Sequence, residues 1–173
     1  MQKRPFYVTD DLLASKGQRL GNYFIDLLIQ YGIAFGLGIA IVLYAEITGD
    51  YTASDYIESI GKIEEYLLGL VIAFGYYFGT EHFLSRSIGK FITKTIIVLE
   101  DGTKPDSMYI LRRTACRLIP FEAFSFLGSP SRGWHDSISD TYVVDKARFD
   151  EQFENHNAFE QIGLSDETTP VIL

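Results

Sequence analysis

The chain has 173 residues, a length typical of one domain, and a formal net charge of −8. Apolar residues make up 47% of the chain although 22% are charged, so the hydrophobicity must be concentrated in blocks. The acidic balance and the lack of a basic, aromatic-rich patch argue against nucleic acid as a partner, and the single cysteine excludes an intramolecular disulfide.

Residues 1–18 form a polar segment that lacks the short apolar core of a cleavable signal peptide. From Leu27 to Ala45 no residue is charged, and about 20 apolar residues suffice to cross a bilayer as a helix. The sequence therefore predicts a first membrane span at about 23–45, which would also act as the insertion signal.

A polar stripe leads into this span. Arg19, Asn22, Asp26 and Gln30 recur at spacings that place all four on one helix face. A carboxylate at the depth of Asp26 must be paired, hydrated or protonated. Two interpretations remain open: Asp26 binds a cation or carries a proton, or it pairs with an arginine or lysine and stabilises the fold.

A second span is predicted at about 66–84, after an acidic loop at about 46–65. Its end carries Glu81, whose face could meet that of Arg19 and Asp26 in one site near the membrane boundary. Such a group could exchange a proton or sodium ion for a salt bridge, or form a static network.

Both spans contain glycines four residues apart, Gly32 with Gly36 and Gly75 with Gly79. This spacing allows helix backbones to approach closely in lipid, and it predicts helix packing within or between chains. Basic residues lie before the first span and after the second, while the connecting loop is acidic. The positive-inside rule then predicts a multi-pass protein of the cell (inner) membrane with both termini in the cytoplasm.

After the second span, residues 86–95 are predicted to form an interfacial helix with Lys90 and Lys94 toward lipid headgroups. Short strands at about 95–99 and 141–144 are predicted to pair. Between them, residues 108–127 are helical in pattern and contain Pro120, which favours a break. This segment is either a peripheral or partly inserted helix, which we favour, or a third crossing. Residues 149–173 are acidic and are predicted to be a disordered tail.

The sequence indicates neither catalytic residues nor a cofactor. His135 and Asp136 are adjacent, and adjacent side chains do not converge on one site. The chain has none of the spacings typical of metal sites, nucleophile elbows or phosphate-binding loops. We therefore expect no metal, no cofactor and no enzymatic activity.

Several segments, taken in order over about 17–145, resemble the RDD family of membrane proteins. They are Arg19–Asp26, Tyr76–Phe78 with Glu81, Ser87–Lys90, Asp101–Gly102, Leu111–Arg113 with Arg117, and His135–Val144. The resemblance implies that Arg19, Asp26 and Asp136 are the arginine and two aspartates that name the family. One departure is Asp140, which stands where the family usually has glycine before the final threonine.

These observations predict an all-α membrane protein with two transmembrane helices, interfacial and cytoplasmic helices, and two short strands. The membrane domain is placed at 19–148, with Arg19 meeting Asp136 to fasten a cytoplasmic cap to the helices. Two functions follow. We expect a small-cation or proton transport component working as a homo-oligomer, which we favour because the polar stripe enters the membrane; the alternative is a non-catalytic anchor or accessory subunit with a membrane or cytoplasmic protein partner. The lipid bilayer is a partner in both.

Overall fold

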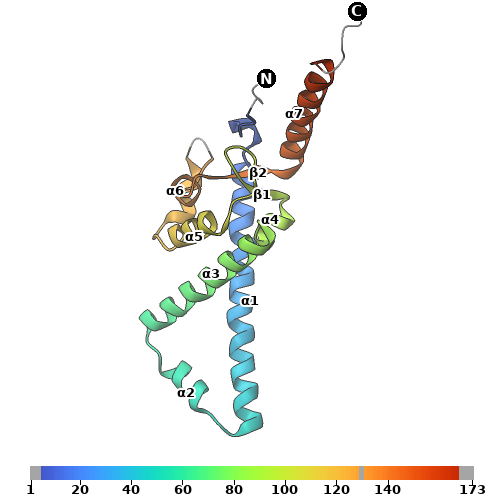
Figure 1. Cartoon of the computed structure of the whole chain (residues 1–173). Coiled ribbons are helices and arrows are strands. Elements are labelled where there is room, and N and C mark those ends of the chain that lie inside the picture. Colours follow the sequence, from blue (N-terminus) through green and yellow to red (C-terminus); the bar gives the residue numbers. More distant parts are fainter. Residues whose placement is uncertain (1–4, 129–130, 168–173) are drawn as a thin grey trace, which may run out of the picture.

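The computed structural model describes residues 5–128 and 131–167 of the chain (Figure 1). The elements are η1 (Asp10–Leu12), α1 (Lys16–Thr48), α2 (Thr52–Ser59), α3 (Lys62–Leu84), α4 (Ile88–Ile92), β1 (Thr95–Leu99), α5 (Ser107–Cys116), η2 (Glu122–Leu127), α6 (Trp134–Ile138), β2 (Thr141–Asp145) and α7 (Lys146–Glu167).

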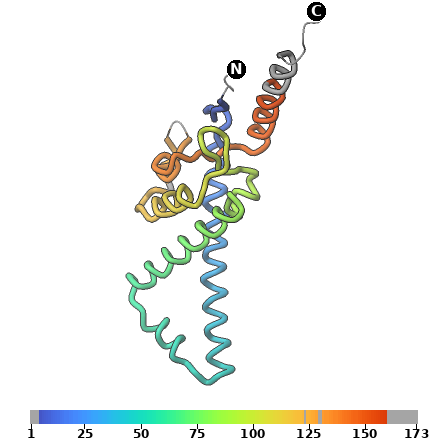
Figure 2. Tube along the Cα trace, in the orientation of Figure 1, coloured from blue at the N-terminus to red at the C-terminus, as the bar shows by residue number. Residues whose placement is uncertain are grey.

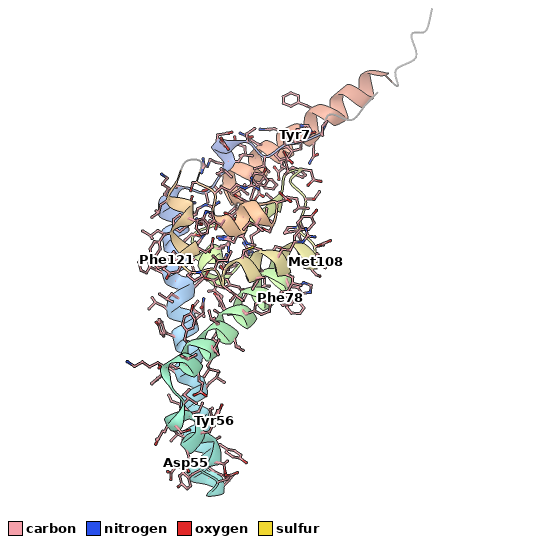
Figure 3. All side chains as sticks on the ribbon, turned by 90° about the vertical axis from the view of Figure 1, so that its left-hand side faces the viewer. Tyr7, Asp55, Tyr56, Phe78, Met108 and Phe121 are labelled. Atoms are coloured by element: carbon pink, nitrogen blue, oxygen red, sulfur yellow. The ribbon has the colours of Figure 1, made fainter. Side chains whose placement is uncertain are left out.

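Two long helices extend from a cap that contains the remaining elements except α2. Within the described residues, α1 and α3 are the helices long and apolar enough to cross a membrane, and they contain the predicted spans 23–45 and 66–84. The two helices lie together near α4 and diverge away from the cap (Figure 2). The helix α2, with Asp55 and Tyr56, lies at the end opposite Tyr7 (Figure 3). The predicted loop at 46–65 thus contains a short helix.

The helix α1 serves both the cap and the span. Its 33 residues correspond to a length of about 50 Å, well beyond a hydrocarbon core of about 30 Å. Ser15 caps its start by accepting a hydrogen bond from the Gln18 amide, and Gly49 ends it in the left-handed conformation. Arg19, Asn22 and Asp26 are buried on the first turns, so the polar stripe belongs to the cap end of the helix.

The predicted strands pair as an antiparallel two-stranded sheet, with Ile97 opposite Val143. Since side chains alternate across a strand, the sheet has two different faces. One face packs against η1 and α7 through Val98 and Val144. The other carries Ile97, which packs with Ile110 of α5, and also the buried hydroxyls of Thr95 and Thr141.

The predicted boundary at residue 18 does not coincide with a structural one. Leu12, Leu13 and Ala14 are buried, and Leu13 forms a bridge with Val144 beside the sheet. The end of the polar N-terminal segment is thus part of the cap core, because Leu12 and Leu13 pack in the cluster on one face of the sheet and Ala14 in the cluster on the other.

The segment at 108–127 breaks near Pro120, as predicted. The helix α5 ends at Cys116, and the 3-10 helix η2 begins at Glu122. At 10 residues, α5 is about 15 Å long, which is too short to cross a bilayer. The structure thus favours the peripheral interpretation over a third crossing.

The predicted disorder of 149–173 is replaced over most of its length by α7 (Lys146–Glu167). Asp145 accepts hydrogen bonds from the Ala147 and Arg148 amides at the start of this helix. Phe149 and Phe153 pack on Phe6 with ring centroids 5.8 Å and 5.0 Å away. These contacts order an acidic segment whose composition alone indicated disorder. Residues 168–173 lie outside the described residues.

Candidate functional site

Asp26 is buried at the contact of α1, α3 and α4, with 1% of its surface exposed. One carboxylate oxygen accepts hydrogen bonds from the Tyr76 hydroxyl (2.6 Å) and the Gly89 amide (2.7 Å). The other accepts one from the Ser87 hydroxyl (2.6 Å). Among the described residues no basic side chain forms an ion pair with Asp26, so of the two interpretations left open by the sequence, the pairing of Asp26 with an arginine or lysine is wrong. Neutral donors satisfy the carboxylate instead.

A short motif at the start of α4 provides two of these donors. Ser87 caps the helix by accepting from the Lys90 amide, and its own hydroxyl donates to Asp26. A Cβ atom at Gly89 would lie 2.6 Å from the Asn22 carbonyl oxygen and 2.8 Å from an Asp26 oxygen. Only glycine lets the backbone of α4 approach α1 closely enough for its amide to reach the carboxylate.

Asp136 links α1 to the cap. Its two carboxylate oxygens accept separately from the Arg19 and Arg113 guanidiniums, and the Gly133 amide donates a third hydrogen bond at 3.0 Å. The predicted contact between Arg19 and Asp136 is therefore present. Arg113 also donates to the Thr141 hydroxyl at 2.7 Å, which ties the same cluster to β2. The flanking arginines hold the pKa of the buried Asp136 well below its ordinary value, against the effect of burial.

Glu81 is fully buried and accepts from three basic side chains. They are Lys90 (2.5 Å), Arg113 (3.1 Å) and Arg117 (3.2 Å). Because Arg113 binds both Glu81 and Asp136, a continuous chain of ion pairs runs from α3 through α5 and α6 to α1. The predicted site combining Glu81 with Arg19 and Asp26 is not formed, since the α4 and α5 cations occupy Glu81.

The predicted contact of Lys90 with lipid headgroups is wrong. Lys90 is 2% exposed and turns inward to Glu81, so it does not contact headgroups. Burial lowers the pKa of Lys90 to about 8, although Glu81 opposes the shift. Lys94 is exposed, and its predicted headgroup contact stays a prediction. The exposed face of α4 is instead apolar, with Phe91 and Ile92 each more than half exposed.

A second buried pair adjoins Asp136. The His135 ring contacts Glu122 through Nδ1 and approaches Asp136 through Nε2 at 3.2 Å. Burial lowers the pKa of His135. Burial acts to raise the pKa of Glu122, but the hydrogen bond and charge of His135 prevail and hold it at about 2. The His-Asp dipeptide thus belongs to a salt-bridge cluster, and no set of three or more metal-ligating side chains assembles among the described residues.

The other members of the polar stripe have different surroundings. The Asn22 amide hydrogen-bonds with the Thr93 and Thr95 hydroxyls. Gln30 lies one turn deeper and lines a cavity. For the glycine motifs, a Cβ atom at Gly32, Gly36, Gly75 or Gly79 would have no neighbouring element within 4 Å. They make no close helix contact within this chain, and packing between chains stays a prediction.

The cavity has a volume of about 360 Å³ and lies between α1, α3, α5 and η2. Charged residues of both signs line its polar side, namely Arg19, Lys90, Arg113, Arg117, Asp26 and Glu122. Apolar side chains from both spans and from the Pro120 break line the rest, namely Leu27, Leu70, Ala73, Phe74, Ile119 and Phe121. Arg117 stacks 3.9 Å above the centre of the Tyr77 ring. The cavity is therefore amphipathic.

Sequence reasoning missed Lys90, Arg113, Arg117 and Glu122 as members of the buried cluster. Lys90, Arg113 and Arg117 lie in segments that carry the family resemblance, and this position could have indicated their role. No such signal in the sequence pointed to Glu122. The family model described as "RDD family" matches residues 13–140, which include Arg19, Asp26 and Asp136. No curated protein and no solved structure matched the chain.

Proposed function

We propose a function from the premise that this chain belongs to the RDD family of membrane proteins: it is a non-catalytic membrane anchor or accessory subunit. In this proposal the buried charges are structural. They fix a cap rigidly to one end of two membrane helices, and the cap and helices then bind other proteins.

The proposal rests on the observation that the buried carboxylates already accept hydrogen bonds and ion pairs from side chains and amides of the same chain. Asp26 accepts three hydrogen bonds, and Asp136 and Glu81 are each bound by at least two cations. Site residues that carry ions must exchange their partners for the transported ion. Removing one partner from a buried ion pair costs about 3–5 kcal/mol, so this network favours a single fixed arrangement.

The helices beyond the cap supply the surface for a partner. They diverge from each other (Figure 1), and the apolar side chains of Tyr31, Phe35 and Val71 are each about two-thirds exposed. Two diverging helices leave their facing surfaces to lipid or to another chain. A homo-oligomer or a membrane protein partner would cover these surfaces.

Transport of a small cation or proton by a homo-oligomer is the second candidate. It is favoured by the cavity, which reaches Asp26 and Gln30 from between the two spans. Two spans cannot enclose a pathway, so this function requires several copies of the chain.

Ion flux in sealed proteoliposomes separates the two candidates. We would compare the wild type with Asp26→Asn, Glu81→Gln and the control Glu58→Gln, which changes an exposed carboxylate on α2. The anchor proposal expects wild-type flux equal to that of empty liposomes, and thermal stability lowered by the first two substitutions but not by the third. Sodium or proton flux that a folded Asp26→Asn protein loses would overturn the proposal and establish transport.

A further inference from the structure

We propose that α4, α5, η2 and α6, here called the inner cap, are embedded in one leaflet of the bilayer, at the depth of the headgroups and upper acyl chains. Their outward faces then contact lipid, while the sheet, η1 and α7, here called the outer cap, lie in water. The inference concerns an interaction surface and does not depend on whether the protein is an anchor or a transporter.

In the inner cap the charged side chains point inward and the apolar side chains point outward. The inward charges are at most 3% exposed, namely Lys90, Arg113, Glu122 and Asp136. The outward apolar side chains are about half exposed or more, namely Phe91, Met108, Phe124, Leu127, Trp134 and Ile138. A surface helix in water shows the opposite arrangement, whereas ionisable side chains within a membrane face the protein interior. The inner cap therefore has the polarity of a surface in contact with lipid.

The outer cap has the ordinary polarity of a protein in water. The sheet packs against α7 through the buried side chains of Val144 and Phe149. The outward side of α7 carries charged residues that are exposed, namely Arg148, Glu151 and Glu154. Since polarity reverses between the two parts of one cap, the boundary between lipid and water passes between the buried ion pairs and the sheet.

The length of α1 sets the depth of the inner cap. Exposed apolar side chains occur on α1 from Leu20 to Ile47, a length of about 40 Å at 1.5 Å per residue. A bilayer with its headgroup regions measures about 40–45 Å, so Leu20 lies at the level of the headgroups. The Phe124 ring of η2 lies 6.4 Å from the Tyr23 ring, and α4 packs against the same turn of α1. Both elements therefore lie within the leaflet.

One residue of the inner cap departs from the inverted polarity. Arg112 of α5 is charged and exposed. A long basic side chain at interfacial depth extends to the headgroups while its methylenes cover apolar surface. Arg112 is thus compatible with the depth that α1 indicates.

The distribution of the outward apolar faces favours lipid over a protein partner. Figure 1 shows α4 on one side of α1 and both α5 and α6 on the other. In Figure 3, Phe121 and Met108 lie apart from each other, near the place where the cap meets the spans. A single partner covers one side of a protein. Lipid surrounds it, and here the lipid that contacts the candidate spans α1 and α3 would continue onto all of these faces.

The test uses the fluorescence of Trp134, the one tryptophan of the chain. It lies beside η2, since its amide donates to the Ser125 hydroxyl (2.8 Å). The full chain would be reconstituted in phosphatidylcholine vesicles with and without lipid brominated near the carbonyl end of its acyl chains, and iodide would be added on both sides of the membrane. We expect the brominated lipid to remove most of the fluorescence and iodide to remove little.

The other outcomes contradict the proposal. Quenching of Trp134 by iodide and not by brominated lipid would place the inner cap in water. Protection from both quenchers would mean that protein covers this face, either a partner or a second copy of the chain. Ion flux is a separate measurement, so this proposal and the proposed function can fail independently.

Tryptophans at other positions locate the boundary. In a Trp134→Phe background, Phe91→Trp and Phe121→Trp place the fluorophore on α4 and at the start of η2. The matched control is Phe159→Trp on α7, and all three wild-type rings are more than half exposed, so each change exchanges one exposed aromatic ring for another. We expect brominated lipid to quench the first two variants and iodide to quench the third. The same quenching at all three positions would overturn the boundary between the inner and the outer cap.

Discussion

Asp26 and Asp136 are both buried carboxylates, but the protein stabilises them in different ways. Asp136 is held by two arginines, whereas Asp26 is held by two hydroxyls and a backbone amide. The difference follows from position along α1. Arg19 lies near the start of the helix, beside the basic residues of the cap, and Asp26 lies two turns further, where α3 and α4 offer neutral donors.

The Asp26 contact makes a prediction about Gly89. In Gly89→Ala the added methyl group would lie within 3 Å of both the Asn22 carbonyl and Asp26, so α4 must move away from α1 and the amide hydrogen bond must weaken. We expect the free energy of unfolding to fall by about 1–3 kcal/mol, the usual cost of overpacking. Thermal unfolding in detergent would measure the change.

The matched control for this substitution is Gly69→Ala on α3. There a Cβ atom meets nothing within 4 Å, and alanine is the better helix former. Its stability should equal or slightly exceed that of the wild type. A similar small effect at both positions would contradict the close approach of α4 to α1.

Glu122 makes a prediction about acid stability. Its pKa is about 2 in the folded protein against an ordinary value of 4.5, so the folded state binds the proton less readily than the unfolded state. The stability that this shift contributes is therefore complete above pH 4.5 and is lost as the pH falls toward 2. Since one pKa unit corresponds to about 1.4 kcal/mol, the contribution of this shift is at most about 3–4 kcal/mol.

The fluorescence of Trp134, the one tryptophan of the chain, would report unfolding because it adjoins His135. We expect the stability difference between wild type and Glu122→Gln to be constant above pH 6.5, where neither Glu122 nor the neighbouring His135 takes up a proton, and to shrink as the pH falls from 4.5 toward 2. Glu154→Gln, which changes an exposed carboxylate, should show no such trend. A difference independent of pH would show that Glu122 titrates normally in the folded protein.

At the scale of elements, the sequence predicted most accurately the helices and strands that a local pattern of residues defines. Uncharged runs located both spans, and strand residues flanking Asp101–Gly102 located β1. The turn before β2 is formed by Asp140 with a φ of +51°. Aspartate tolerates this left-handed conformation better than most residues do, so the departure from the family's glycine leaves the turn intact.

The sequence was misleading where a long-range partner decides the direction of a side chain. Lys90 and Lys94 look equivalent on a short helix, but Glu81 draws only Lys90 inward. Likewise the sequence left the partner of Asp26 open, because the Ser87 hydroxyl and Gly89 amide that donate to it lie 61 and 63 residues away. The disorder predicted after residue 148 failed for the same reason, since Phe6 packs on α7 from the other end of the chain.

At the scale of the whole molecule, buried contacts hold the cap together, whereas α1 and α3 separate from each other beyond it. All the buried ion pairs and both core clusters of the described residues lie at the cap end, and α1 and α3 diverge beyond it (Figure 2). Because the helices diverge, the glycine faces of α1 (Gly32 and Gly36) and α3 (Gly75 and Gly79) contact no other described element of the chain. In a bilayer such faces are typical of helix–helix contacts, and a second copy of the chain is the simplest source of one.

We therefore predict that Gly36→Leu weakens self-association without destabilising the cap. The side chain would meet nothing within the chain, but it would separate two helices that pack through the Gly32–Gly36 face. Crosslinking in membranes, or a FRET titration against the lipid-to-protein ratio, would measure the loss of dimer. Gly38→Leu is the control, because it lies on another face of α1 and is equally open within the chain. Equal association of the two variants would mean that this face contacts lipid, and any oligomer would then have to form through α3 or the cap.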